Sequence, residues 1–128
     1  MELKDKVALV TGASRGIGRA IAMALAEKGA TVVGTATTAA GAQALHEWLS
    51  AKGGRGVALD VNDQEAVSAL VDSLGKELAG PHILVNNAGI TRDNLAMRMK
   101  DEEWDSVLQT NLGSVFRLSQ AVMRPMMK

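Results

Sequence analysis

The sequence has 128 residues, of which 47% are hydrophobic, and its 14 acidic and 14 basic side chains give a formal net charge of +0. A chain of this length suits one domain with a packed core, and the balanced charge argues against a surface for nucleic acid or another polyanion. Cysteine is absent, which excludes disulfides, thiolate chemistry and cysteine-based metal sites.

Two further classes are disfavoured by the distribution of apolar residues. No apolar run approaches the roughly 20 residues that span a bilayer. The first residues also lack the apolar core of a signal peptide. We therefore expect a soluble, cytoplasmic protein that has neither a membrane nor a nucleic acid as its partner.

The hydrophobic period alternates between strand and helix along the chain. It predicts strands over 6–10, 31–35, 56–59 and 82–86, helices over 15–28, 39–51, 63–78 and 101–123, and a loop over 87–100. Gly29, Gly53–Gly54 and Gly80–Pro81 are expected to end the first three helices. Asn62 is expected to cap the third helix, with Glu65 completing a capping box.

This order of elements predicts the fold class. Strands that alternate with helices of ten or more residues form βαβ units and a parallel sheet. Right-handed crossovers then give the strand order 3-2-1-4, with a ligand crevice between the first and fourth strands. The fold is therefore α/β: a doubly wound parallel sheet in three layers (Rossmann-type, αβα), ending after the fourth strand and the long helix that follows. Residues 1–128 would form one partial nucleotide-binding domain.

A glycine-rich turn follows the first strand. The apolar run over 7–10 stops at Thr11-Gly12, and further glycines stand at positions 16 and 18. A strand, a tight turn and a helix N-terminus can cradle a dinucleotide pyrophosphate, because glycine lets phosphate oxygens approach the backbone N–H donors. The spacing is G-x-x-x-G-x-G rather than the common G-x-G-x-x-G, and such a turn alone also serves structural purposes. Whether this turn binds a nucleotide must therefore be decided from other residues at the carboxyl ends of the strands.

The end of the second strand bears on the choice of cofactor. Residues 33–38 contain no Asp or Glu, which an NAD site would use to accept hydrogen bonds from the ribose hydroxyls. Without a carboxylate to repel a 2′-phosphate, and with Arg15 in the glycine turn and a hydroxyl at Thr37, the pattern favours NADP(H). The structural alternative is that Arg15 is a solvated turn residue.

Three further positions have both a functional and a structural interpretation. Asp60, after the third strand, can accept from the adenine amino group or can be a turn residue. Asn86-Asn87-Ala88-Gly89 can bind the cofactor ribose or can tie strand ends together. Asn111 lies inside a helical pattern, where Asn is unfavourable, and is either a buried structural amide or part of a site.

The remaining polar and methionine-rich positions are less specific. His46 and His82 have no metal-ligand spacing, so we expect structural or surface histidines and no metal site. The methionines of the loop and of the last residues are expected in packing or subunit contacts. The loop over 90–100 mixes cations with methionine, and it can guide an anionic, partly apolar substrate or be a plain solvated loop.

Two motifs give the chain a resemblance to the short-chain dehydrogenases/reductases. Residues 11–18 (Thr-Gly-Ala-Ser-Arg-Gly-Ile-Gly) match that family's cofactor motif, and residues 86–89 match its motif after the fourth strand. Residues 89–100, Glu103-Trp104 and the stretch 110–112 look most like the bacterial 3-oxoacyl-[acyl-carrier-protein] reductases of fatty acid biosynthesis. The resemblance covers the whole chain.

The resemblance implies a role for each matching residue. The pyrophosphate and 2′-phosphate of NADP(H) would be held by Gly12, Ala13, Ser14, Arg15, Gly16, Ile17 and Gly18. Thr37 would lie near the adenosine phosphate, Asp60 and Val61 near adenine, and Asn87, Ala88 and Gly89 near the ribose. Asn111 matches the Asn of the family's Asn-Ser-Tyr-Lys catalytic tetrad. The implied reaction is hydride transfer from NADPH to a 3-oxoacyl thioester on acyl carrier protein, in a homo-oligomer that is a tetramer for a complete family member.

The chain departs from the family at the catalytic positions. It contains no tyrosine and stops before the segments that carry Ser, Tyr and Lys, so only Asn111 of the tetrad is present. We therefore expect the N-terminal part of such a reductase, inactive alone, with its fourth strand left as an apolar edge. The alternatives are a non-catalytic nucleotide-binding fragment, or a fragment that self-associates through the fourth strand and the helix over 101–123.

Overall fold

A computed structural model of the chain describes residues 2–88 and 100–127. Its strands are β1 (Val7–Val10), β2 (Thr31–Ala36), β3 (Arg55–Ala58) and β4 (Ile83–Val85). Its helices are α1 (Gly16–Glu27), α2 (Ala39–Leu49), α3 (Gln64–Leu78), α4 (Asp101–Leu108) and α5 (Ser114–Met127), with a 3-10 turn η1 (Ser50–Lys52) and a π-helical turn η2 (Gln109–Gly113). The expected strands and helices are present, with their ends shifted by a few residues, while most of the expected loop over 87–100 lies outside the described residues.

The four strands form one parallel sheet in the order β3-β2-β1-β4, as the crossover rule predicts. Leu9 of β1 pairs with Val33 on one side and with Leu84 on the other. The strand order reverses between β1 and β4, and parallel strands leave a crevice beyond their carboxyl ends at such a point. Among the described residues β4 is an edge strand, and its side chains are half-buried.

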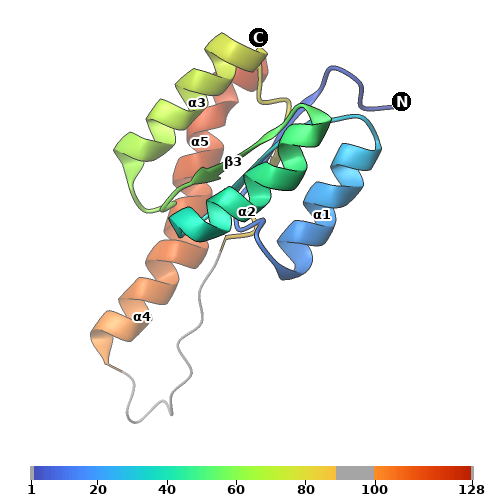
Figure 1. The fold of residues 1–128 in the computed structure, drawn as a ribbon. Coiled ribbons are helices and arrows are strands. Elements are labelled where there is room, and N and C mark those ends of the chain that lie inside the picture. The colour runs from blue at the N-terminus through green and yellow to red at the C-terminus, as the bar shows by residue number, and fades with distance from the viewer. Residues whose placement is uncertain (1, 89–99, 128) are drawn as a thin grey trace.

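Helices cover both faces of the sheet, which confirms the three-layer architecture (Figure 1). Side chains alternate along β1, so Ala8 and Val10 pack in the layer of α1 and α2, whereas Leu9 packs in the layer of α3 and α5. Every residue of β1 is at most 3% exposed. Burial on both faces explains why this strand is a continuous apolar run in the sequence.

The helix expected over 101–123 is present and continues to Met127. It runs through α4, the π-helical turn η2 and α5, and α4 extends past the sheet (Figure 1). A π-helical turn inserts one extra residue into a helix, and such turns often mark functional sites. Asn111 lies within this turn.

The cap expected for α3 was wrong by one residue. Asp63 is the N-cap, because its carboxylate accepts a hydrogen bond from the backbone N–H of Ala66 at 3.1 Å. Asn62 instead donates its backbone N–H to the carboxylate of Asp60 at 2.9 Å. The carboxylate of Asp63 has the three-residue spacing that reaches an unpaired N–H of the first turn, so the cap and the capping box expected from Asn62 and Glu65 do not form.

The glycines expected at helix ends are found there, although not always as the capping residue. Lys28 is the C-cap of α1, and Gly29 follows it with φ +99°. Gly53 ends η1 with φ +81°. At the end of α3, Ala79 takes the left-handed conformation with φ 57°, just before Gly80-Pro81.

His82 lies at the beginning of β4 and accepts a hydrogen bond at Nδ1 from the backbone N–H of Val7, at 2.9 Å. His82→Ala leaves that buried N–H without an acceptor, and we expect a loss of about 1–2 kcal/mol in the free energy of unfolding, measured with urea. The matched variant is His46→Ala, because His46 accepts from the N–H of Gly56 at 3.2 Å in an exposed position. His46→Ala should lower the free energy of unfolding by less than about 0.5 kcal/mol. Equal losses in the two variants would contradict a structural role for the hydrogen bond of His82.

Arg55 of β3 and Glu77 of α3 form an ion pair at the surface. The guanidinium lowers the pKa of Glu77 from its ordinary 4.5. Because the pKa is lower in the folded chain, the pair stabilises above pH 4.5 and is lost as the pH falls through the folded value. We expect Glu77→Gln to flatten the decrease in melting temperature below that pH. Since both side chains are partly exposed, the difference should disappear in 1 M salt.

Candidate functional site

The candidate site begins with the turn between β1 and α1. Gly12 and Gly16 both have φ +62°, a left-handed conformation that side chains with a Cβ rarely adopt. A Cβ added to Gly16 would meet no atom of the described residues within 4 Å, so its open side leaves room for a ligand at the first turn of α1. The turn therefore has the form that presents backbone N–H groups to an anion.

Gly18 has a different role, because it lets α1 pack directly on this turn. A Cβ at position 18 would lie 2.1 Å from the carbonyl oxygen of Gly12 and 2.4 Å from Nδ2 of Asn87. Gly18 is buried and does not line the cleft described below. It therefore contributes by close packing of helix and turn, as the third glycine of dinucleotide-binding turns does.

Thr11 and Asn87 join the glycine turn to the end of β4. The Oγ1 of Thr11 accepts the backbone N–H groups of Asn87 and Ala88, each at 3.0 Å. The Nδ2 of Asn87 donates to the carbonyl oxygen of Gly12 at 3.0 Å. The structural interpretation of the Asn-Asn-Ala-Gly stretch, that it ties strand ends together, is thus confirmed for Asn87. A contact of this residue with a cofactor ribose stays a prediction.

Asn86 ties β4 to the last helix in the same way. Its Nδ2 donates to the Oγ of Ser119 on α5, at 3.2 Å. Together with Asn87, it connects β4 both to the opposite helix layer and to the glycine turn. Gly89, the last residue of this motif, lies outside the described residues.

The end of β2 also lies beside the glycine turn. The N–H of Ala13 donates to the carbonyl oxygen of Thr35 at 2.8 Å, which holds the glycine turn against this strand. Thr38 caps α2, since its Oγ1 accepts from the N–H of Gly41 at 3.0 Å. The hydroxyl of Thr37, in contrast, is on an exposed residue that lines the cleft together with Arg15.

Asp60 follows β3 and serves as a turn residue. Its carboxylate accepts the N–H of Asn62, and its carbonyl oxygen accepts the N–H of Asp63 at 2.9 Å. The structural interpretation of Asp60 is therefore confirmed. The residue is also exposed and lines the cleft, so a contact with an adenine amino group stays a prediction.

The carboxyl ends of the four strands β1, β2, β3 and β4 surround one cleft of about 670 Å³. Among the predicted cofactor residues, those that line it are Gly12, Ser14, Arg15, Gly16, Thr37, Asp60, Val61, Asn87 and Ala88. Ala13 is fully buried behind the turn, and Ile17 is 74% exposed and is not part of the lining. The volume suits a drug-sized or nucleotide-sized ligand.

Five lining residues were not among the predicted site residues: Thr35, Ala36, Leu59, Asn62 and Ser106. The first four adjoin the carboxyl ends of β2 and β3, so the strand assignments could have identified them. Ser106 is on α4, and no sequence signal placed that helix beside the cleft.

The cleft contains one cationic and one anionic side chain among its described lining residues. Arg15 and Asp60 are the charged residues among those described that line it. An arginine in the glycine turn is suited to a phosphate, because guanidinium groups form paired hydrogen bonds with phosphate oxygens. The residues present therefore fit a phosphorylated dinucleotide, with the cation at the glycine turn and the carboxylate after β3.

Asn111 is exposed, so its interpretation as a buried structural amide was wrong. It lies within the π-helical turn η2, whereas Ser114 and Leu118, further along the long helix, are buried. Within residues 2–88 and 100–127, no cluster of three His, Cys, Asp or Glu side chains could hold a metal ion. No helix in this described part of the chain is long and apolar enough to cross a membrane.

Comparison with known proteins adds an independent observation. The family model for short chain dehydrogenases matches residues 6–128. The 3-oxoacyl-[acyl-carrier-protein] reductase of Escherichia coli is 59% identical over 128 residues, which are 100% of this chain and 52% of that protein.

Two further relatives carry the same name. The reductase of Pseudomonas aeruginosa is 57% identical over 130 residues, covering 100% of this chain and 53% of its own length. The reductase of Haemophilus influenzae is 55% identical over 126 residues, covering 98% and 52%. The chain thus spans about half the length of the curated relatives that it matches.

Proposed function

Because the chain belongs to the short chain dehydrogenase family, we propose that it is the NADP(H)-binding, N-terminal part of a 3-oxoacyl-[acyl-carrier-protein] reductase. The observation that carries the proposal is the cleft at the carboxyl ends of β1, β2, β3 and β4. It combines an open glycine turn, one arginine and one carboxylate. In the complete enzyme the substrate would be a 3-oxoacyl thioester on acyl carrier protein, as the names of the relatives state for those proteins.

Each part of the cleft would have one task toward the cofactor. The backbone N–H groups at the start of α1 would bind the pyrophosphate, and Arg15 would pair with the 2′-phosphate. Asp60 would accept from adenine, and Thr37 would add a hydroxyl beside the adenosine phosphate. The end of β2 supports a preference for NADP(H) over NAD(H). Residues 33–38 contain no Asp or Glu, and an acidic side chain there would repel the 2′-phosphate.

The same residues cannot complete the reduction of a ketone. A bound NADPH supplies a hydride, and the alkoxide that forms must then receive a proton from an acid. The sequence contains no tyrosine, and Asn111 has no proton to give at neutral pH. We therefore expect no turnover of an acetoacetyl thioester by these 128 residues alone.

A titration with half of the cofactor tests the proposal. Adenosine 2′,5′-bisphosphate carries the 2′-phosphate without the nicotinamide, and 5′-AMP is its matched control. We expect saturable binding of the bisphosphate by calorimetry, at least tenfold tighter than that of 5′-AMP. If neither ligand binds, the cofactor-binding function fails; if 5′-AMP binds equally well, the NADP(H) preference fails.

A second candidate function, self-association, is favoured by the outer face of the long helix. Large apolar side chains are exposed along it: Trp104 58%, Leu108 40%, Leu112 65%, Phe116 66% and Met123 58%. The first turn of α4 is acidic, and the last turn of α5 contains Arg124. Two copies paired in antiparallel orientation would bring opposite charges together, so we propose that the chain forms a homo-oligomer through this face.

Phe116→Glu tests this assembly. A charge in the middle of the apolar face should shift the mass measured by light scattering from oligomer to monomer, because the carboxylate would have to be desolvated in the interface. Met23→Glu is the control, since Met23 is 42% exposed on α1, away from this face. A monomer in the unmodified chain at high concentration would overturn the assembly.

A further inference from the structure

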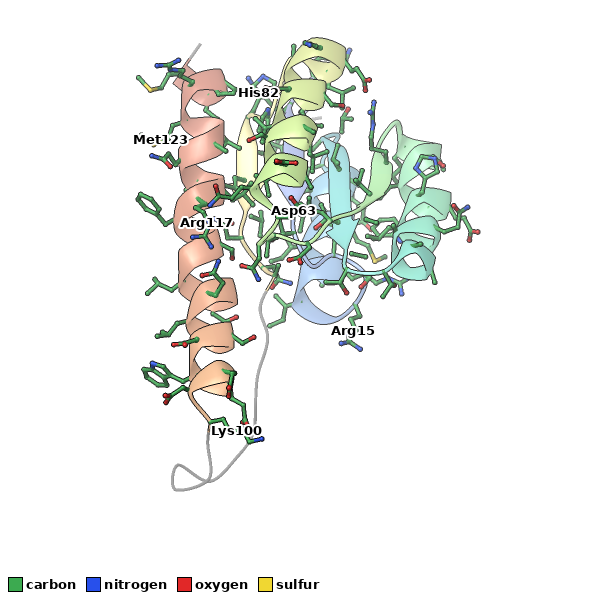
Figure 2. All side chains as sticks on the ribbon, turned by 90° about the vertical axis from the view of Figure 1, so that its left-hand side faces the viewer. Arg15, Asp63, His82, Lys100, Arg117 and Met123 are labelled. Atoms are coloured by element: carbon green, nitrogen blue, oxygen red, sulfur yellow. The ribbon has the colours of Figure 1, made fainter. Side chains whose placement is uncertain are left out.

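Arg15, the cation of the cofactor cleft, is not held in place by its neighbours. It is exposed at the N-cap of α1, and its guanidinium forms no hydrogen bond or ion pair with another described residue. Figure 2 shows its side chain extending from the glycine turn away from the rest of the chain. Because the stem of an arginine is a flexible methylene chain, the charged end can take many positions at the edge of the cleft.

The hydroxyl of Thr37, at the end of β2, is also free to turn. Thr37 is exposed, and within residues 2–88 and 100–127 its Oγ1 forms no hydrogen bond. The neighbouring Thr38 differs, because its Oγ1 accepts from the N–H of Gly41 at 3.0 Å and caps α2. The two side chains assigned above to the adenosine phosphate, Arg15 and Thr37, therefore supply a charge and a hydroxyl without a fixed geometry.

The parts of the cleft assigned to adenine and to the pyrophosphate are held by hydrogen bonds instead. The carboxylate of Asp60 accepts the N–H of Asn62 at 2.9 Å. The N–H of Ala13 donates to the carbonyl oxygen of Thr35 at 2.8 Å, which fixes the glycine turn. A site distinguishes two isomers of a ligand where its own groups are locked in the geometry that one isomer requires. The described residues of the cleft provide such groups for adenine and the pyrophosphate, but not for the position of a phosphate on the ribose.

On the basis of the proposed cofactor function, we propose that the cleft accepts a phosphate on either the 2′ or the 3′ oxygen of the adenosine ribose. It would then also bind compounds built on adenosine 3′-phosphate 5′-diphosphate, the class to which coenzyme A belongs. These compounds share adenine and the 5′-diphosphate with NADP(H), and their ribose phosphate is on the adjacent carbon. The guanidinium of Arg15 can form paired hydrogen bonds with a phosphate at either position. Coenzyme A would therefore compete with the dinucleotide, its pantetheine arm taking the place of the nicotinamide half.

Calorimetric titration of the purified chain with adenosine 3′,5′-bisphosphate tests this tolerance, with adenosine 2′,5′-bisphosphate and 5′-AMP as comparison ligands at one ionic strength. We expect the affinities of the two bisphosphates to agree within about fivefold, and both to exceed that of 5′-AMP by roughly tenfold or more. A larger preference for the 2′ isomer overturns the tolerance and leaves the proposed function standing. If neither bisphosphate binds, the tolerance and the proposed function both fail.

Coenzyme A and dephospho-coenzyme A form a matched pair of ligands, because they differ only in the 3′-phosphate. Coenzyme A should displace adenosine 2′,5′-bisphosphate from the chain, and dephospho-coenzyme A should require a concentration roughly tenfold higher or more. Equal displacement by the two compounds would show that the 3′-phosphate is not recognised. Binding of coenzyme A without displacement would place it at another site. Either result contradicts the proposed binding of coenzyme A.

Arg15→Met tests whether one guanidinium serves both phosphate positions. It should lower the affinities for the two bisphosphates by the same factor, about 10- to 100-fold. Arg19→Met is the control, since Arg19 lies over the ring of Trp48 and does not line the cleft, and it should leave both affinities within about twofold. A loss in Arg15→Met confined to the 2′ isomer, or no loss with either ligand, contradicts the shared role. The melting temperature of each variant shows that the fold is retained, as expected for exposed side chains.

Discussion

Gly18→Ala is expected to destabilise the chain by about 3 kcal/mol, the upper part of the range for an overpacked site. The added methyl would lie 2.1 Å from the carbonyl oxygen of Gly12 and 2.4 Å from Nδ2 of Asn87. The first of these atoms is backbone, and the second already donates to it at 3.0 Å, so neither can move alone. The start of α1 must therefore shift away from the turn. Urea unfolding followed by circular dichroism measures the loss.

Two other glycines provide matched controls. Gly75 is exposed within α3, and among the described residues a Cβ there would meet only the carbonyl oxygen of Gly80, at 3.9 Å. Gly75→Ala should stabilise by about 0.5–1 kcal/mol through helix propensity. In Gly16→Ala the added methyl would contact no atom of the described residues, but the backbone keeps φ +62°, so the change should cost about 1–2 kcal/mol of stability. A Gly18→Ala variant no less stable than Gly16→Ala would contradict the packing described for α1.

Arg15→Met is expected to weaken binding of adenosine 2′,5′-bisphosphate by roughly 10- to 100-fold, while binding of 5′-AMP stays within about twofold. The reason is that Arg15 is the cation among the described residues lining the cleft, and a hydrogen bond to a charged group contributes about 1.5–3 kcal/mol. Calorimetry with both ligands at one ionic strength gives the two affinities. The prediction concerns the difference between them, which general weakening of the fold would not produce.

Arg19→Met is the control for the loss of a positive charge from α1. Arg19 lies over the ring of Trp48, 5.9 Å from its centroid, and does not line the cleft. We expect it to leave the affinity for the bisphosphate within about twofold. If Arg15→Met weakens the binding of both ligands equally, then Arg15 holds the pyrophosphate end of the cofactor rather than the 2′-phosphate. The charge of Arg15 would then no longer support NADP(H) over NAD(H).

Much of the candidate site could be predicted because it follows strand ends. The carboxyl ends of parallel strands meet at one edge of a sheet, so assigning β1, β2 and β3 already brought Gly12, Thr37 and Asp60 together. The same logic could have included Leu59 and Asn62. It could not include Ser106, because the approach of α4 to the cleft depends on the direction of a long helix that packs against α3 further along.

Local competition explains the predictions that were wrong. Asn62 and Asp63 are adjacent, and both are good capping residues, so the sequence pattern cannot choose between their registers. In the structure, the N–H of Asn62 is already bonded to Asp60, and this turn leaves Asp63 to cap α3. The interpretation of Asn111 as a buried amide assumed a regular helix, and the π-helical turn interrupts that regular period.

The sequence by itself determined the order and type of the elements, the parallel sheet and the glycine turn, because these depend on hydrophobic period and on residues close together in the chain. Only the tertiary structure decided which polar groups are already used. Thr11 and Gly12 bond to residues more than 70 positions away, which commits the Nδ2 of Asn87 to the fold. Burial of the Nε and Nη2 atoms of Arg117, which have no hydrogen-bond partner among the described residues, is likewise a property of the tertiary packing, since an isolated helix would leave that guanidinium in water.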